Sequence, residues 1–235
     1  MDSALYRWPK AAKFGRTVPK SKFYDAVAVR PAVRNKFVAE VHRITWAYKL
    51  ADATIHLRGN AAVPEIQVFV VDAKDDDVGV EVLTAIDKAV LFPIIFEINR
   101  RIGERVETRM VAAYKQLSRN SWRTSAYFST VWQDGAAPRV ALPPAVDLIA
   151  LYAGLLGPIL PIAPRPGEAL SRTHERVEGA RKLEREIEGL RRRLRVEPQL
   201  NRKVELRRQL KERVEALAEL TAPSAHTNED AAWTS

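Results

Sequence analysis

The chain has 235 residues, of which 46% are hydrophobic and 29% charged, and its formal net charge is +9. This composition is typical of a water-soluble globular protein. The absence of cysteine excludes a disulfide framework, a thiolate metal site and a cysteine nucleophile. A chain without cysteine suits a reducing compartment, so we expect a cytoplasmic protein. The positive charge favours an anionic partner such as nucleic acid.

Residues 1–30 are predicted to form an irregular, basic N-terminal arm. Its lysines are interleaved with aromatic residues, as in the stretch from Lys20 through Lys22 to Phe23 and Tyr24. Lysines beside aromatic rings can contact phosphates while the rings stack on bases, so Lys20 and Lys22 are candidate nucleic-acid contacts. The alternative is an arm that packs Phe23 and Tyr24 on the domain and leaves its lysines in solvent.

The globular domain is expected over residues 31–156, with an α/β (α+β) fold built on a mixed sheet of about five strands flanked by helices. Apolar residues at three- and four-residue steps predict a helix over 31–50. Further helices are predicted over 80–90 and 145–155, and strands over 53–57, 65–73, 94–98, 107–116 and 125–131. The order strand, helix, strand within 65–98 predicts a parallel pair of strands. The apolar run 140–161 contains Asp147 and several prolines, so no membrane span is expected.

The C-terminal part divides into a proline-rich linker over 157–169, a helical hairpin over 170–221 and a tail over 222–235 that we expect to be disordered. Pro198 separates two charged helices that each carry one apolar stripe. The stripe has heptad-like spacing and consists of Leu183, Ile187, Leu190, Leu194, Leu206, Leu210, Val214 and Leu217. This pattern predicts an antiparallel coiled coil. So narrow a seam needs a covering surface, which is the twin helix, the globular domain or another protein.

The turn of this hairpin is basic. It carries Arg191, Arg192, Arg193, Arg202 and Lys203, and Glu197 is the only acidic residue between the first and the last of them. One interpretation is a solvated surface, partly neutralised by helical pairs such as Glu188 with Arg192. The others are a tip that contacts phosphates and a tip that docks an acidic partner.

One hypothesis is enzymatic. Asp72 and Lys74 lie two residues apart on a predicted strand and therefore face the same side. With Glu65 or Asp52 they could hold a divalent metal and polarise a phosphodiester, as in nucleases of the restriction-endonuclease-like class. The alternative is that Asp72 and Lys74 are polar residues where a buried strand reaches solvent. The four histidines lack metal-ligand spacing and no nucleotide-binding loop motif is present, so neither a metal nor a cofactor is predicted.

Several segments carry a resemblance to a known family. They are VPKSKFY (18–24), ITWAYKLA (44–51), TIHL (54–57), EIQVF (65–69), IDKAV (86–90), PIIF (93–96) and EPQLNRKVEL (197–206). Together they resemble the bacterial domain-of-unknown-function family 4391, over about residues 16–220. The resemblance implies an accessory protein encoded beside Swi/Snf-like helicases and type III-like DNA methyltransferases, in operons that look like anti-phage or restriction-like systems. It implies no catalytic residue. Where relatives are expected to have an acidic residue after EIQVF, this chain has Val70, which weakens a metal site on that strand.

The expected function is therefore that of a non-catalytic accessory subunit of a bacterial defence or restriction-like complex. Its expected partners are helicase or DNA methyltransferase subunits of the same operon, with nucleic acid as a plausible further ligand. Two alternatives stay open, namely a metal-dependent nuclease and an inhibitor or antitoxin-like binder of a neighbouring effector. The sequence leaves the oligomeric state open.

Overall fold

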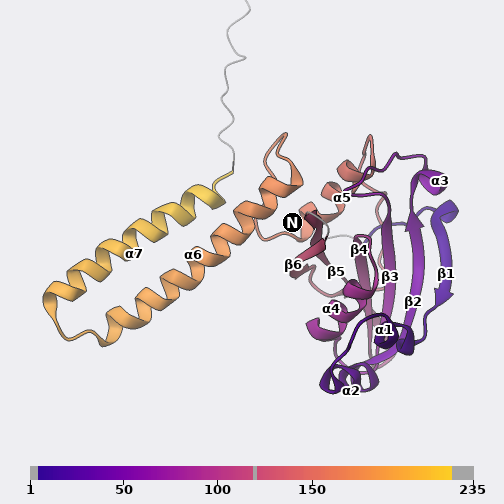
Figure 1. Ribbon diagram of the computed structural model, residues 1–235, viewed down its shortest axis with the longest axis horizontal. Coiled ribbons are helices and arrows are strands. Elements are labelled where there is room, and N and C mark those ends of the chain that lie inside the picture. Colours follow the sequence, from indigo (N-terminus) through magenta and orange to yellow (C-terminus); the bar gives the residue numbers. More distant parts are fainter. Residues whose placement is uncertain (1–4, 119–120, 224–235) are drawn as a thin grey trace, which may run out of the picture. The chain divides into compact units, whose positions relative to one another are not determined.

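The computed structural model describes residues 5–118 and 121–223 (Figure 1). These residues form two compact units, which divide between Leu160 and Pro161. The first unit is a mixed sheet with helices, and the second is a pair of long helices. The expected tail over 222–235 lies outside the described residues from position 224 onward. No described helix has both the length and the apolar character needed to cross a membrane.

A mixed sheet of seven described strands forms the first unit. In chain order these are β1 (Lys13–Thr17), β2 (Val41–Leu50), β3 (Ile66–Ala73), β4 (Ile94–Ile102), β5 (Arg105–Ser118), β6 (Ser121–Ser129) and β7 (Gln133–Asp134). The spatial order follows the chain from β1 to β6, and β7 pairs with β5. The pair β3–β4 is parallel, as the sequence predicts, and the other pairs are antiparallel. The expectation of an α+β fold is confirmed, but the strand number is larger than the five expected.

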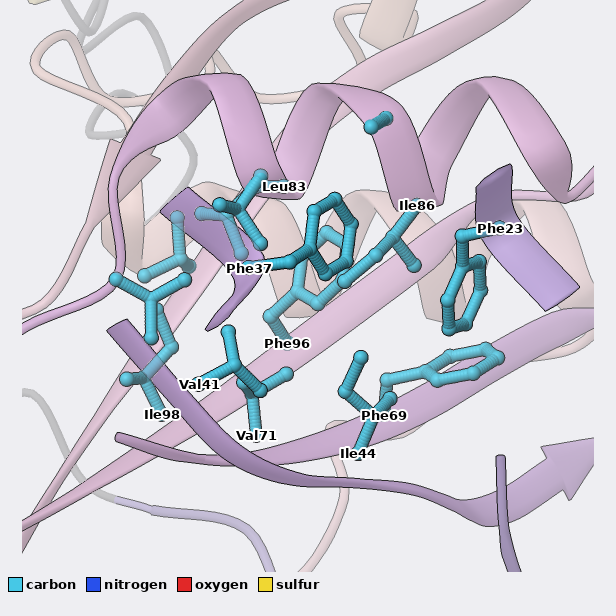
Figure 2. Close-up of a cluster of buried hydrophobic side chains, with 14 of the residues drawn as sticks. Phe23, Phe37, Val41, Ile44, Phe69, Val71, Leu83, Ile86, Phe96 and Ile98 are labelled. Carbon is cyan, nitrogen blue, oxygen red and sulfur yellow. The ribbon is translucent and has the colours of Figure 1, made fainter. Parts of the chain in front are cut away.

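Helices cover the sheet and close its core. They are η1 (Lys10–Ala12), α1 (Lys20–Ala26), α2 (Pro31–Glu40), α3 (Asp52–Ile55), α4 (Val80–Ala89), α5 (Leu148–Leu156) and η2 (Gly157–Ile159). Figure 2 shows side chains of α1, α2 and α4 packed against those of β2, β3 and β4. Phe37 of α2 and Phe96 of β4 are fully buried in this cluster. Burial of each such ring contributes about 1.5–3 kcal/mol, so this layer fixes the sheet against its helices.

The helix predicted over 31–50 is wrong in its second half. The helix α2 ends at Glu40 and the strand β2 begins at Val41. In β2 the buried residues are Val41, Ile44, Ala47 and Leu50, at intervals of three that imitate a helical period. The cause is irregular pairing with β3, whose register shifts between Val41 and Arg43 and again between Trp46 and Tyr48. Each shift reverses the face of the residues that follow, so the two-residue period of a strand is hidden.

Two other local predictions are also corrected. Residues 53–57 form no strand, because Asp52–Ile55 is the short helix α3. Its Thr54 hydroxyl accepts a hydrogen bond from the backbone N–H of Ala51 and donates one to the carbonyl of Lys49, which stabilises a turn there. Part of the arm predicted to be irregular is folded into η1, β1 and α1. Phe23 is buried in the core, which agrees with the alternative of an arm packed on the domain.

The second unit is the predicted antiparallel hairpin. It consists of α6 (Leu170–Val196) and α7 (Leu200–Thr221), joined by three residues (Figure 1). At the end far from the turn, the Arg176 guanidinium donates to the Leu220 carbonyl over 2.8 Å. Nearer the turn, Arg213 and Glu186 form an ion pair of 2.9 Å across the two helices. This hydrogen bond and this ion pair join residues far apart in the sequence and fix the register of α6 against α7.

Candidate functional site

The structure does not bring the four candidate nuclease residues together. Asp72 lies near the end of β3, and Glu65 directly precedes its first residue. Six residues of extended chain lie between Glu65 and Asp72, which places them roughly 20 Å apart. Asp52 begins the helix α3, and Lys74 is exposed beyond the end of β3. Among the described residues there is no cluster of three or more His, Cys, Asp or Glu side chains that could hold a metal ion.

Asp72 instead belongs to a row of polar side chains across neighbouring strands. Its Oδ2 accepts a hydrogen bond from Nε of Arg43 over 2.8 Å, and its Oδ1 accepts one from Nδ2 of Asn99 over 2.9 Å. Thr108 continues the row by donating to Oδ1 of Asn99 over 2.8 Å. Both oxygens of Asp72 are therefore engaged by residues of the sheet. This geometry agrees with the interpretation of Asp72 as a polar residue at the end of a buried strand.

Glu65 has similar local partners. Its Oε1 accepts a hydrogen bond from Nε2 of Gln67 over 2.5 Å, and its Oε2 lies 2.7 Å from the Lys49 ammonium. The carboxylate thus joins β2 to the start of β3. Both carboxylate oxygens of Glu65 have a partner in the fold. These contacts explain the position of Glu65 without a bound metal.

A buried ion pair connects α4 with β5. The Lys115 ammonium is 2.7 Å from Oδ1 of Asp87, and the two side chains are only 3% and 4% exposed. It also donates to the carbonyls of Asp87 and Val90, and the Tyr127 hydroxyl donates to Oδ2 of Asp87. Burial raises the pKa of Asp87, while Lys115 opposes that shift. All three protons of Lys115 are used within the fold, so this network anchors the end of α4 to β5.

The two lysines of the N-terminal segment differ in their surroundings. The Lys20 ammonium donates to the Val41 carbonyl over 2.5 Å, and burial lowers its pKa, with the charge of Lys74 adding to that effect. Lys22 is exposed and lines a largely apolar cavity of about 300 Å³ between α1, β2, β3 and the end of α4. Other residues of this lining are Val18, Phe23, Ala26, Trp46, Gln67, Phe69, Ala89, Val90, Leu91 and Phe92. Lys20 therefore has a packing role, and Lys22 is the freer of the two cations.

The apolar seam of the hairpin is unevenly covered. Ile187, Leu190 and Leu206 are buried, and Val214 is 41% exposed. The remaining seam residues, Leu183, Leu194, Leu210 and Leu217, are partly buried. The predicted stripe thus contains three buried residues, four partly buried residues and one exposed residue. The buried seam residues are concentrated toward the turn, where α6 meets α7.

Charged side chains of the hairpin differ between the turn and the rest of the two helices. Away from the turn, most basic residues are paired with a glutamate, as in Arg172–Glu175, Arg176–Glu168, Lys182–Glu186, Arg208–Glu205 and Lys211–Glu215. We call residues 191–204 the hairpin tip. Its six basic residues form no ion pair with any other residue in the described part of the chain, and the expected pair of Glu188 with Arg192 is absent there. These six are Arg191, Arg192, Arg193, Arg195, Arg202 and Lys203.

The tip also carries three exposed aliphatic residues that the sequence reasoning passed over. They are Val196, Leu200 and Val204. Their exposure could have been inferred from their positions, because none of the three continues the heptad stripe that packs between the helices. The tip thus combines unpaired cations with uncovered apolar side chains.

The described chain thus consists of a folded sheet unit and a helical hairpin whose tip cations form no ion pair with a described residue. The family model of a domain of unknown function (DUF4391) matches residues 7–217. The chain therefore belongs to this family, and the match includes both the sheet and the hairpin. Neither the curated proteins nor the solved structures contain a match to the chain.

Proposed function

We propose that this protein is a non-catalytic accessory subunit of a bacterial anti-phage defence or restriction-like complex. In this proposal the hairpin tip holds a helicase or DNA methyltransferase subunit, and DNA is a further ligand of the same basic side chains. The proposal unites the family resemblance with the charge distribution of the second unit.

The observation that carries the proposal is the set of six tip cations without ion pairs. Elsewhere on the hairpin a ligand anion would have to compete with a glutamate for most of the guanidinium and ammonium groups, with Arg185 and Arg207 as the exceptions among the described residues. At the tip no such competition exists, because Glu197 is the only acid between Arg191 and Lys203. Clustered cations of one sign attract an anionic surface and raise its association rate.

The test is charge reversal of Arg192, Arg193, Arg202 and Lys203 to Glu in one variant. Co-purification with the helicase and methyltransferase subunits should fall by at least about tenfold, because each lost charge contact weakens the complex and each new acid repels the partner. Pull-down of the co-expressed subunits, followed by titration of the purified proteins, measures the loss.

The matched control reverses four exposed cations of the same helices that have glutamate neighbours. These are Arg172, Lys182, Arg208 and Lys211, with side chains 75%, 73%, 61% and 79% exposed. The net charge changes by the same amount, so a general electrostatic effect would weaken both variants alike. Equal losses, or no loss in either variant, would contradict a role for the tip.

DNA binding is measured separately. For duplex DNA, the logarithm of affinity falls with the logarithm of salt concentration with a slope of about −0.9 per phosphate contact. If the tip contacts the DNA backbone, the four-residue reversal should make this slope less negative by about one unit per lost contact. An unchanged slope would remove DNA from the ligands of the tip.

The nuclease alternative has less support, because both oxygens of Asp72 already accept hydrogen bonds from Arg43 and Asn99. Incubation of the protein with plasmid DNA and Mg²⁺ or Mn²⁺, with Asp72→Ala as control, is the direct assay. Cleavage that disappears in this variant would replace the binding proposal by the enzymatic one.

A further inference from the structure

The hairpin tip presents aliphatic side chains to solvent to an unusual degree. Val196 is 78% exposed, Leu200 is 71% exposed and Val204 is 58% exposed. Val196 is the last residue of α6 and Leu200 is the first residue of α7, with three residues between them. Leu200 and Val204 are one helical turn apart, so they share a face of α7. The three residues therefore bracket the turn of the hairpin.

Cationic residues flank this apolar trio on both helices. Arg192 lies one turn before Val196 on α6, and Arg207 lies three residues after Val204 on α7. Arg195 and Lys203 are sequence neighbours of the trio, and neither forms an ion pair with a described residue. The turn region thus combines three exposed aliphatic side chains with a majority of basic neighbours, and Glu197 and Glu205 are the acidic residues next to the trio.

This combination of side chains distinguishes between classes of partner. Contacts to nucleic-acid phosphates come from charged and polar groups, and aliphatic side chains add little to them. Protein interfaces, in contrast, have an apolar centre and a polar rim, and they are enriched in Arg and depleted of Lys. Five of the six tip cations are Arg. Burial of these aliphatic side chains would add a hydrophobic contribution that phosphate contacts alone would forgo.

We infer that the hairpin tip binds an acidic, amphipathic segment of a protein partner. Apolar side chains of that segment cover Val196, Leu200 and Val204, and its carboxylates pair with the surrounding arginines. The inference rests on the proposed function, since it takes the tip as the partner-binding site, and it adds the chemistry of the bound segment. Charge complementarity to the unpaired arginines selects an acidic partner over a second copy of this basic chain.

The test keeps every cation and removes only the apolar patch, through the variant Val196→Ser, Leu200→Ser, Val204→Ser. Three probes are compared, namely the helicase and methyltransferase subunits, a short DNA duplex, and phosphatidylcholine vesicles containing phosphatidylserine. The subunit that binds the wild-type protein should lose at least about tenfold in affinity for the variant, as expected for loss of an apolar interface centre. DNA affinity should stay within about twofold, because phosphate contacts are electrostatic.

The matched control replaces three exposed valines outside the hairpin, Val38, Val131 and Val146, by Ser. These side chains are 58%, 72% and 89% exposed, so the control removes comparable apolar surface. Leu200→Met provides a second check, since it keeps an apolar side chain and should retain wild-type affinity. Urea unfolding of all variants shows whether each remains folded.

The possible outcomes separate this inference from the proposed function. Partner binding that survives the Ser variant but is lost on charge reversal would overturn the apolar site and leave the proposed function standing. Partner binding that survives both would overturn both. A parallel loss of DNA affinity in the Ser variant would assign the patch to nucleic acid, and a loss of vesicle binding without loss of partner binding would assign it to a lipid surface.

Discussion

The two units of this protein use charged residues in opposite ways. In the sheet unit, Asp87 and Lys115 are almost fully buried as a pair, and Glu97 is buried while bound to Arg139. In the hairpin, nearly all ion pairs are exposed, and the tip has cations without ion pairs. Buried charges are engaged by the fold, whereas exposed unpaired charges are available to a ligand. The comparison therefore contrasts buried, paired charges in the first unit with exposed charges in the second, of which those at the tip form no ion pair with a described residue.

The largest expected effect follows from breaking the buried pair. Lys115→Met leaves the Asp87 carboxylate without its cation in a buried position. Loss of one member of such a pair typically costs about 3–5 kcal/mol, so the free energy of unfolding of the sheet unit should fall by that amount. Urea unfolding followed by tryptophan fluorescence measures it.

The double variant Lys115→Met, Asp87→Asn tests the cause. Because no charge remains buried, it should be more stable than Lys115→Met alone. A single variant that loses less than about 1 kcal/mol would show that solvent reaches the site, and the contrast between the two units would weaken.

A smaller effect is expected from the hairpin seam. Leu206 is 5% exposed, whereas Val214 on the same helix is 41% exposed. Leu206→Ala should lower the free energy of unfolding by about 2–3 kcal/mol, and Val214→Ala by less than about 1 kcal/mol. Thermal unfolding monitored by circular dichroism at 222 nm compares them. Equal losses would contradict the uneven packing, because they would mean that Val214 is packed as tightly as Leu206 in solution.

One ion pair of the hairpin is largely buried, namely Glu168 with Arg176 at the end far from the turn. Both oxygens of Glu168 accept hydrogen bonds from Arg176, and Arg165 N–H and Thr173 add two more to Oε2. Chiefly through Arg176, the pKa of Glu168 is lowered from 4.5 to about 2. A lowered carboxyl pKa stabilises the folded state above pH 4.5, and this contribution is lost as the pH falls from 4.5 toward 2.

Glu168→Gln removes the charge but retains one amide oxygen as an acceptor. The hairpin should lose about 1–2 kcal/mol at neutral pH, because a buried guanidinium loses its carboxylate. The variant should also lack the part of the acid-induced decrease that Glu168 causes between pH 4.5 and 2. Unfolding curves at a series of pH values measure both effects, and curves that stay parallel over this range would contradict the role given to Glu168.

A helix or strand of this protein can be predicted from the sequence when its pattern lies within one continuous segment. The two helices of the hairpin and the strand β3 are predicted from local patterns, and all three are found. The strand β2 has a pattern distorted by pairing with β3, and β1 is a basic segment whose structure comes from pairing with β2. Such features depend on a neighbour distant in the sequence, which a periodicity search cannot detect.

The candidate site likewise has features that the sequence predicts and features that only the fold reveals. The basic residues of the tip could be identified from the sequence, because they are consecutive or nearly so. Their lack of ion pairs could not, since Glu188 has the correct spacing for Arg192 and yet does not pair with it among the described residues. The partners of Asp72 come from β2 and β4, and only the strand register brings Arg43 and Asn99 beside it. Electrostatic partners are therefore the part of a site that needs the fold.

The smallest effect on stability is expected at the tip itself, and its sign is the informative quantity. The tip cations lie near one another without acidic partners, so they repel. Arg192→Gln removes one of the repelling charges without placing an acid four residues after Glu188 or near the C-terminus of α6, so it should raise the free energy of unfolding slightly, by up to about 0.5 kcal/mol at low salt. The gain should vanish as salt screens exposed charges. Urea unfolding at low and high salt measures it, whereas a salt-independent loss would reveal a structural contact of Arg192 and would make the tip resemble the sheet unit.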